Sequence, residues 1–213
     1  LIEAVRDGVL AEANGALDMT NGGTITAGDS AVRGHDTSGQ DDMLRNLAGG
    51  VLNGNVWLYA GNNTIYNQGD IYGAVRNLLG DDLLDNSGSI TGDVLMGFGT
   101  DTLLNTGRIA GDVDAGDGND VVTNTGQVFG TLALGAGTDV FDGRGGTVDG
   151  VVQGLNGNDV FYIDQDGARI DGGTALRAAR VTMIIVGNVI SDSTSPPTSG
   201  APRGRPKKFR NTA

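Results

Sequence analysis

The chain has 213 residues, carries a net charge of −12, and contains 38 glycines but no cysteine. The missing cysteine excludes disulfides and thiolate metal sites. Of the 26 acidic residues only Glu3 and Glu12 are glutamate, which leaves 24 aspartates. Asp, Asn and Gly favour turns over helix interiors, so this composition excludes an ordinary helical domain and indicates a turn every few residues.

Residues 1–60 contain weak copies of a repeat that becomes regular further on. The string NGGTIT, starting at Asn21, resembles an early remnant, and a looser copy begins at Asp42. No charged segment followed by an apolar one opens the chain, so no signal peptide is visible. Four aromatic residues lie close together where these weak copies give way to the regular repeat. We expect them to fill the core of a degenerate coil rather than form an exposed carbohydrate or receptor platform: Trp57, Tyr59, Tyr66 and Tyr72.

Residues 61–172 repeat with a period of 19 residues. Two successive units read GTDTLLNTGRIAGDV and GNDVVTNTGQVFGTL. Asparagine recurs at Asn67, Asn86, Asn105 and Asn124, and glycine at Gly69, Gly88, Gly107 and Gly126. The apolar columns are Ile65, Leu84, Leu103, Val122 and Phe141; Ile71, Ile90, Ile109 and Val128; and Val75, Val94, Val113 and Leu132.

Within one unit, residues such as Leu103, Asn105 and Ile109 alternate with mostly polar neighbours. Alternation with period two indicates strands, and frequent Gly and Asn indicate that they are short. A 19-residue unit is too short for a pair of helices but suits one coil. We therefore predict an all-β fold, a right-handed parallel β-helix, in which inward asparagines of successive coils form a hydrogen-bonded ladder.

One acidic position recurs every 19 residues at Asp82, Asp101, Asp120 and Asp139, and again at Asp159 after a step of 20. In a stack of coils these carboxylates lie above one another, where like charges repel by roughly 1 kcal/mol in water. The column should therefore face solvent or be neutralised by cations. The alternative is a series of Asx-type turns in which each Asp or Asn caps local backbone amides.

The strings GFGTD, GDGND and GAGTD resemble the glycine- and aspartate-rich repeats of RTX (haemolysin-type) proteins. The resemblance implies calcium bound between coils by this aspartate column, and calcium is the one cofactor the sequence suggests. The match is partial, because RTX repeats run in nonapeptides, two per coil. An RTX-type calcium-binding domain of a haemolysin-like secreted protein is thus one functional alternative.

The full unit GxGxDxLxNxGxIxGxV resembles the passenger repeats of bacterial autotransporters (type V secretion). The resemblance covers 61–172 well and 20–60 loosely. It implies an exported, structural or adhesive module, secreted or at the bacterial cell surface, with a host receptor or glycan as partner. It also implies an outer-membrane β-barrel in the full-length protein, which this sequence does not contain, so we expect the chain to be a fragment.

Catalysis is not expected. Residues 1–172 hold no lysine, and their arginines do not cluster. The single histidine, His35, has no nucleophile motif around it, and the regular repeat argues against an active site, which normally interrupts a repeat.

The composition changes near residue 173. Residues 80–172 hold 16 aspartates against three arginines, a net of −13, whereas 173–213 hold seven basic residues against one aspartate, a net of +6. We expect a terminal strand or cap over 173–190 and a disordered basic tail over 191–213. Its RGRP core resembles an AT-hook. This resemblance implies binding to the minor groove of DNA through Arg203, Arg205, Lys207 and Lys208. The acidic charge of the rod nevertheless makes nucleic acid an unfavoured partner.

Overall fold

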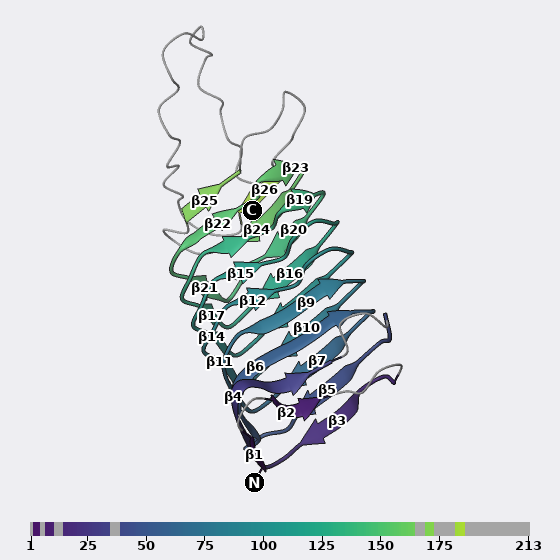
Figure 1. Cartoon of the computed structure of the whole chain (residues 1–213). Helices are drawn as coiled ribbons and strands as arrows, with labels where there is room; N and C mark the ends of the chain where they lie inside the picture. The colour runs from purple at the N-terminus through teal and green to yellow at the C-terminus, as the bar shows by residue number, and fades with distance from the viewer. Residues whose placement is uncertain are drawn as a thin grey trace, which may run out of the picture.

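The computed structural model describes residues 2–4, 7–10, 15–34, 39–164, 169–172 and 182–185, and within these ranges every regular element is a β-strand. The strands stack in parallel along one axis, from the N-terminal coils at the bottom of Figure 1 to the C-terminal coils at its top. The fold is an all-β parallel β-solenoid with turns of about 19 residues, as the repeat predicts. No helix in the described part could cross a membrane.

Each coil contributes one strand to a nine-stranded parallel sheet, which runs the length of the solenoid. Its members are β3 (Asp18–Asn21), β5 (Met43–Asn46), β7 (Thr64–Asn67), β10 (Leu83–Asn86), β13 (Thr102–Asn105), β16 (Val121–Asn124), β20 (Val140–Asp142), β24 (Val160–Ile163) and β26 (Thr182–Ile185).

The second sheet has fifteen strands in two rows that meet on the long strands β4 (Thr24–Arg33) and β6 (Val51–Ala60). One row comprises β8 (Asp70–Tyr72), β11 (Ser89–Ile90), β14 (Arg108–Ile109), β17 (Gln127–Val128) and β21 (Thr147–Val148). The other comprises β9 (Val75–Leu79), β12 (Val94–Leu95), β15 (Val113–Asp114), β18 (Leu132–Ala133), β22 (Val151–Gln153) and β25 (Arg169–Asp171).

Three short pairings complete the structure. The strands β1 (Ile2–Ala4) and β2 (Asp7–Leu10) pair with β4 at the N-terminal end, and β19 (Ala136–Gly137) pairs with β23 (Asn156–Gly157). The first coils are longer than the regular ones, since equivalent asparagines are 25 residues apart at Asn21 and Asn46 but 19 apart at Asn67 and Asn86. The described residues between 2 and 60 therefore belong to solenoid coils despite their weak sequence repeat.

The interior is filled by columns of apolar side chains. All three predicted columns are confirmed, with Leu84, Ile90 and Val94 fully buried in one coil and their equivalents buried in the others. The sequence analysis missed a fourth column, which contains Leu58, Asn77, Met96, Ala115 and Leu134. Its members differ so much in size and polarity that they do not read as one repeated position.

The predicted asparagine ladder is confirmed. Each amide Nδ2 donates to the Oδ1 of the next coil, at 2.7 Å from Asn67 to Asn86, 2.8 Å from Asn86 to Asn105, and 2.7 Å from Asn105 to Asn124. Buried amides need such partners, because an unpaired polar group costs about 1–3 kcal/mol. The ladder therefore fixes the register of the coils as well as filling the interior.

Replacing Asn105 by Ala should destabilise the solenoid by about 2 kcal/mol, because it leaves Asn124 Oδ1 without its donor and opens a small cavity. Asn119→Ala is the matched control, since the exposed Asn119 accepts only an outer bond, from the Thr138 amide. Urea unfolding followed by circular dichroism measures both. Equal midpoints for the two variants would show that the ladder does not stabilise the fold.

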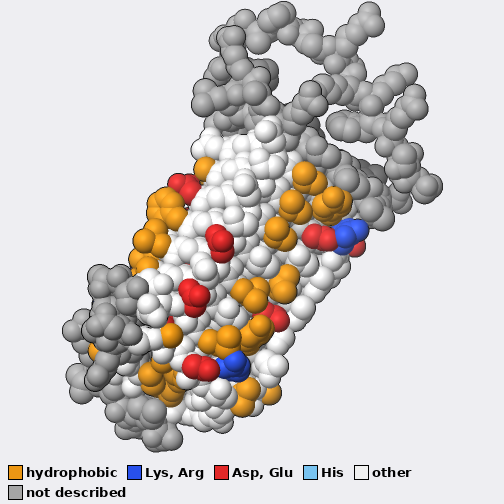
Figure 2. Space-filling model, turned by 90° about the vertical axis from the view of Figure 1, so that its right-hand side faces the viewer, with side chains coloured by type: hydrophobic (Ala, Val, Ile, Leu, Met, Phe, Trp, Pro, Cys, Tyr) orange, Lys and Arg blue, Asp and Glu red, His pale blue; other side chains and the backbone are white. Residues whose placement is uncertain are grey.

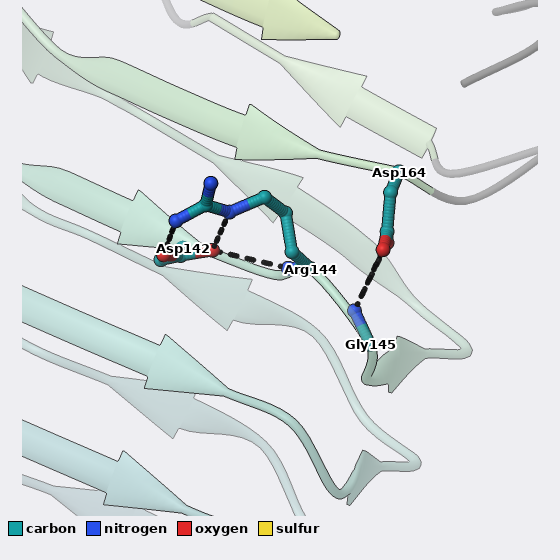
Figure 3. A network of polar contacts seen from close by, with 4 residues as sticks. All are labelled: Asp142, Arg144, Gly145 and Asp164. Atoms are coloured by element: carbon teal, nitrogen blue, oxygen red, sulfur yellow. Dashed lines mark hydrogen bonds and ion pairs between the residues drawn. The ribbon is translucent and has the colours of Figure 1, made fainter. Parts of the chain in front are cut away.

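The repeat slips by one residue between Asp139 and Asp159, and a different set of polar contacts holds that turn (Figure 3). Arg144 donates from Nε and Nη2 to Asp142, at 2.8 and 2.5 Å, and this contact lowers the pKa of Asp142. The Gly145 amide, in turn, donates to Asp164 in the following coil at 3.0 Å. One ion pair and one bond from a backbone amide to a carboxylate thus hold the chain where the asparagine column ends.

The strand β26 lies within the predicted terminal segment 173–190 and pairs in parallel with β24. The remainder of that segment and the whole predicted tail 191–213 lie outside the described residues.

Candidate functional site

The aspartate column lies inside the solenoid. Asp101 and Asp120 immediately precede β13 and β16, and each side chain points the same way as the buried apolar residue and the buried Asn two and four residues later. The five aspartates of the column are at most 2 % exposed: Asp82, Asp101, Asp120, Asp139 and Asp159. The structure therefore brings together every residue predicted for the calcium column.

Each carboxylate binds the backbone of the neighbouring coil. Asp101 Oδ1 accepts the amide of Asp82 at 2.8 Å, and Asp120 Oδ1 accepts the amide of Asp101 at 2.8 Å. Asn63 occupies the same column, where its uncharged Oδ1 accepts the Asp42 amide at 3.0 Å. The bonded amides belong to the preceding coil, so these are not the local Asx-type turns considered from the sequence.

The second carboxylate oxygen, Oδ2, is buried without a hydrogen-bond partner among the described residues at all five aspartates. Burial raises the pKa of Asp82 to about 8 and that of Asp139 to about 7, and it raises the pKa values of Asp101 and Asp120 to about 6. Burial likewise raises the pKa of Asp159. The bonds from backbone amides oppose this rise, but the loss of water outweighs them.

Protonation of buried carboxyl groups therefore lowers the electrostatic repulsion within the column, which was not predicted from the sequence. We expected it either to face solvent or to be neutralised by cations. It is instead buried, and the raised pKa values mean that part of it carries protons at neutral pH. A protonated carboxyl keeps the Oδ1 acceptor for the amide and removes the charge, which is the expensive part of burial.

The calcium predicted for the column depends on the oxygen atoms that the column can offer. Calcium takes about six to eight oxygen ligands, but within the described residues no three His, Cys, Asp or Glu side chains are placed to hold a metal. The carbonyl of Gly97, the first glycine of one GxGxD string, accepts the Asp117 amide at 2.9 Å. Calcium binding by the column stays a prediction, and a titration described below tests it.

The aromatic residues near residue 60 are not in the core, so that prediction was wrong. Trp57 and Tyr59 lie on the outer side of β6 and are half-buried, whereas Val56 and Leu58 point inward. Tyr66 and Tyr72 are exposed, at 38 % and 52 %. Alternation along the strands keeps the rings outside, because Trp57 lies between inward neighbours and Tyr66 lies between the buried Ile65 and Asn67.

Two predicted features cannot be placed. His35 and the basic residues Arg203, Arg205, Lys207 and Lys208 lie outside the described residues, so DNA binding by the tail stays a prediction. Comparison of the chain with family models, curated proteins and solved structures finds no match. The resemblances to autotransporter passengers and RTX repeats thus rest on the repeat itself.

Proposed function

We propose that the chain is a structural repeat module of an exported protein, a non-catalytic solenoid that presents its outer surface at the bacterial cell surface or in secreted form. The observation that carries the proposal is the continuous stacking from β3 to β24. Successive coils are joined by backbone bonds, and the regular coils also by an asparagine ladder and an aspartate column. The asparagine and aspartate side chains, types that form catalytic sites in other proteins, here form hydrogen bonds between coils.

The architecture also suits export. A solenoid folds by adding coil to coil, so it can assemble progressively from an extended chain. The absence of cysteine removes any dependence on a redox compartment. In this proposal an outer-membrane β-barrel elsewhere in the full-length protein anchors the rod, and a host receptor or glycan is its partner.

Antibodies raised against residues 39–164 test the location on the source cells. We expect them to label intact cells and to lose that signal after brief proteinase treatment, while a cytoplasmic marker stays protected. Labelling that requires cell lysis would overturn the proposal of surface exposure or secretion, unless the protein is recovered from the medium.

The dependence of folding on calcium distinguishes this proposal from the RTX-type alternative. In excess chelator we expect the β-sheet circular dichroism of the full chain to be present already, and about 5 mM calcium to raise the Tm by less than about 2 °C, because the column is bonded to backbone amides. Magnesium at equal concentration is the control for ionic strength. A β signal that forms only after calcium is added would favour the RTX alternative.

A further inference from the structure

An unusual group of side chains lies on the outer surface where the irregular coils meet the regular ones. Arg33 on β4, Trp57 on β6 and Arg76 on β9 are register partners across three neighbouring strands. The guanidinium carbons lie 5.9 Å (Arg33) and 5.7 Å (Arg76) from the centre of the Trp57 ring, and Arg33 also lies 5.5 Å from the ring of Tyr59. We call these four residues the arginine–aromatic cluster.

The cluster holds positive charge that acidic partners only partly neutralise. Arg33 reaches Asp7 at 3.8 Å, whereas Arg76 is exposed and forms no ion pair with the described residues. Other arginines of the rod are engaged differently, as Arg45 binds Asp18 and Arg144 binds Asp142. Because the two guanidiniums flank one tryptophan across two strand spacings, they lie about 10 Å apart.

A groove continues from the cluster along the rod. Leu95, the register partner of Arg76, lines it together with Leu78 and Phe98, and the space has a volume of about 220 Å³. The glycines Gly97 and Gly116 form its floor, where a Cβ atom at Gly116 would meet the Gly97 carbonyl. Figure 2 shows hydrophobic side chains in bands along one face of the rod, with acidic side chains scattered between them.

The far end of the groove is acidic. Asp114 and Asp117 line it, and partial burial, together with the nearby charge of Asp117, raises the pKa of Asp114. A ligand in the groove therefore meets cations and an aromatic ring at one end, apolar walls in the middle, and two carboxylates at the other. Most ligand sites combine apolar walls with a few polar groups in this way.

We propose that the cluster and groove bind an oligosaccharide whose terminal sugar carries a carboxylate and whose following sugars are neutral. The terminal carboxylate pairs with Arg76, which forms no ion pair with the described residues, and its sugar ring lies beside Trp57, the register partner of Arg76. Arg33 adds positive charge on the other side of Trp57. The neutral sugars place their apolar faces against Leu95 and Phe98. Their hydroxyls donate to the carboxylates at the far end.

The pattern of charge disfavours other anionic ligands. A nucleic acid or a fully sulfated glycan carries a charge on almost every unit, so its second half would meet Asp114 and Asp117 at short range, where salt screens little. The proposal deepens the proposed function, since it names the glycan partner of the rod. Binding by the purified chain is nevertheless independent of where the protein is located, so either proposal can fail alone.

The fluorescence of Trp57, the single tryptophan of the chain, gives a direct readout. With the full chain we expect sialyllactose to change this fluorescence saturably, with a Kd of about 1 mM, and lactose to bind at least about tenfold more weakly. Arg76→Gln should weaken sialyllactose binding about tenfold. Arg108→Gln, which removes an exposed arginine stacked 4.4 Å from the Phe129 ring on another face, should change it less than about twofold.

Saturation-transfer NMR on the ligand provides a second readout that does not depend on the tryptophan. Circular dichroism and Tm of both variants confirm that the fold is intact. The proposal is overturned if sialyllactose gives no saturable signal up to about 20 mM. Binding of lactose as strong as that of sialyllactose, an equal loss in both arginine variants, or tighter binding of a sulfated heparin fragment would overturn it too.

Discussion

The rod should become less stable as the pH rises from about 4 to about 8, with a fall in Tm of about 10 °C. The column aspartates have folded pKa values raised by burial, up to about 8 for Asp82, above the ordinary 3.8 of the unfolded chain. Below pH 3.8 both states are protonated, and the full stabilisation is present. As the pH rises, the unfolded chain ionises first, so stability is lost until the folded pKa is passed.

One group acts in the opposite direction. Arg144 lowers the pKa of Asp142, so its contribution is lost as the pH falls below the ordinary range. That pair is exposed and screened by solvent, whereas the column contains five buried carboxyls. The stability of the whole chain should therefore fall as the pH rises, as the column alone predicts. A protein stabilised mainly by surface ion pairs would show the reverse slope in this range.

Asp82→Asn tests whether the column causes this slope. Asn63 already occupies the column without charge, so an amide is accommodated there. We expect the Tm of the variant, relative to that of the unchanged chain, to rise by about 5 °C between pH 5 and pH 8. Asp149→Asn, at an exposed aspartate, is the control and should leave the slope unchanged. Parallel curves for the variant and the unchanged chain would show that Asp82 is not the source.

Gly118→Ala should prevent stable folding or reduce the free energy of unfolding by about 5 kcal/mol. A Cβ atom at this position would lie 1.5 Å from the carbonyl oxygen of Gly99 in the coil before it. Since Gly137 makes the same approach to Gly118 in the next coil, the chain cannot relax by moving one coil alone. The second glycine of each GxGxD string is thus required by coil spacing.

Gly23→Ala is the control for this variant, because a Cβ atom there meets nothing within 4 Å. It should unfold at the same urea concentration as the unchanged chain. Soluble yield, circular dichroism and urea midpoints measure both variants. If Gly118→Ala proves as stable as Gly23→Ala, the coils at this corner do not stack as closely as the structure shows.

The repeat predicted the coil, its register and most of its interior. A fixed step of 19 residues specifies which residues stack, and period-two alternation specifies which face inward, so Leu103 and Asn105 were placed correctly. The same alternation, continued two residues back from Leu103, places Asp101 inside. The repulsion expected between stacked like charges led instead to the prediction of a column that faces solvent or is neutralised by cations.

Features that depend on the corners of the coil could not be predicted. Tyr59 has a left-handed backbone where β6 is irregularly paired, and nothing in the local sequence marks that irregularity. The groove beside Phe98 arises from stacked glycines at one corner and outward apolar residues next to them. Both are consequences of how three strands turn around an axis, which a period alone does not specify.

A carboxyl-carbon NMR titration of the full chain, in chelator and again with about 5 mM calcium, tests most directly whether the column carries protons rather than metal. The burial of the column predicts titration of Asp82 near pH 8, of Asp139 near pH 7, and of Asp101 near pH 6, with no change when calcium is added. Column carboxyls that ionise near pH 4, or whose pKa values fall sharply with calcium, would contradict this reading of the repeat.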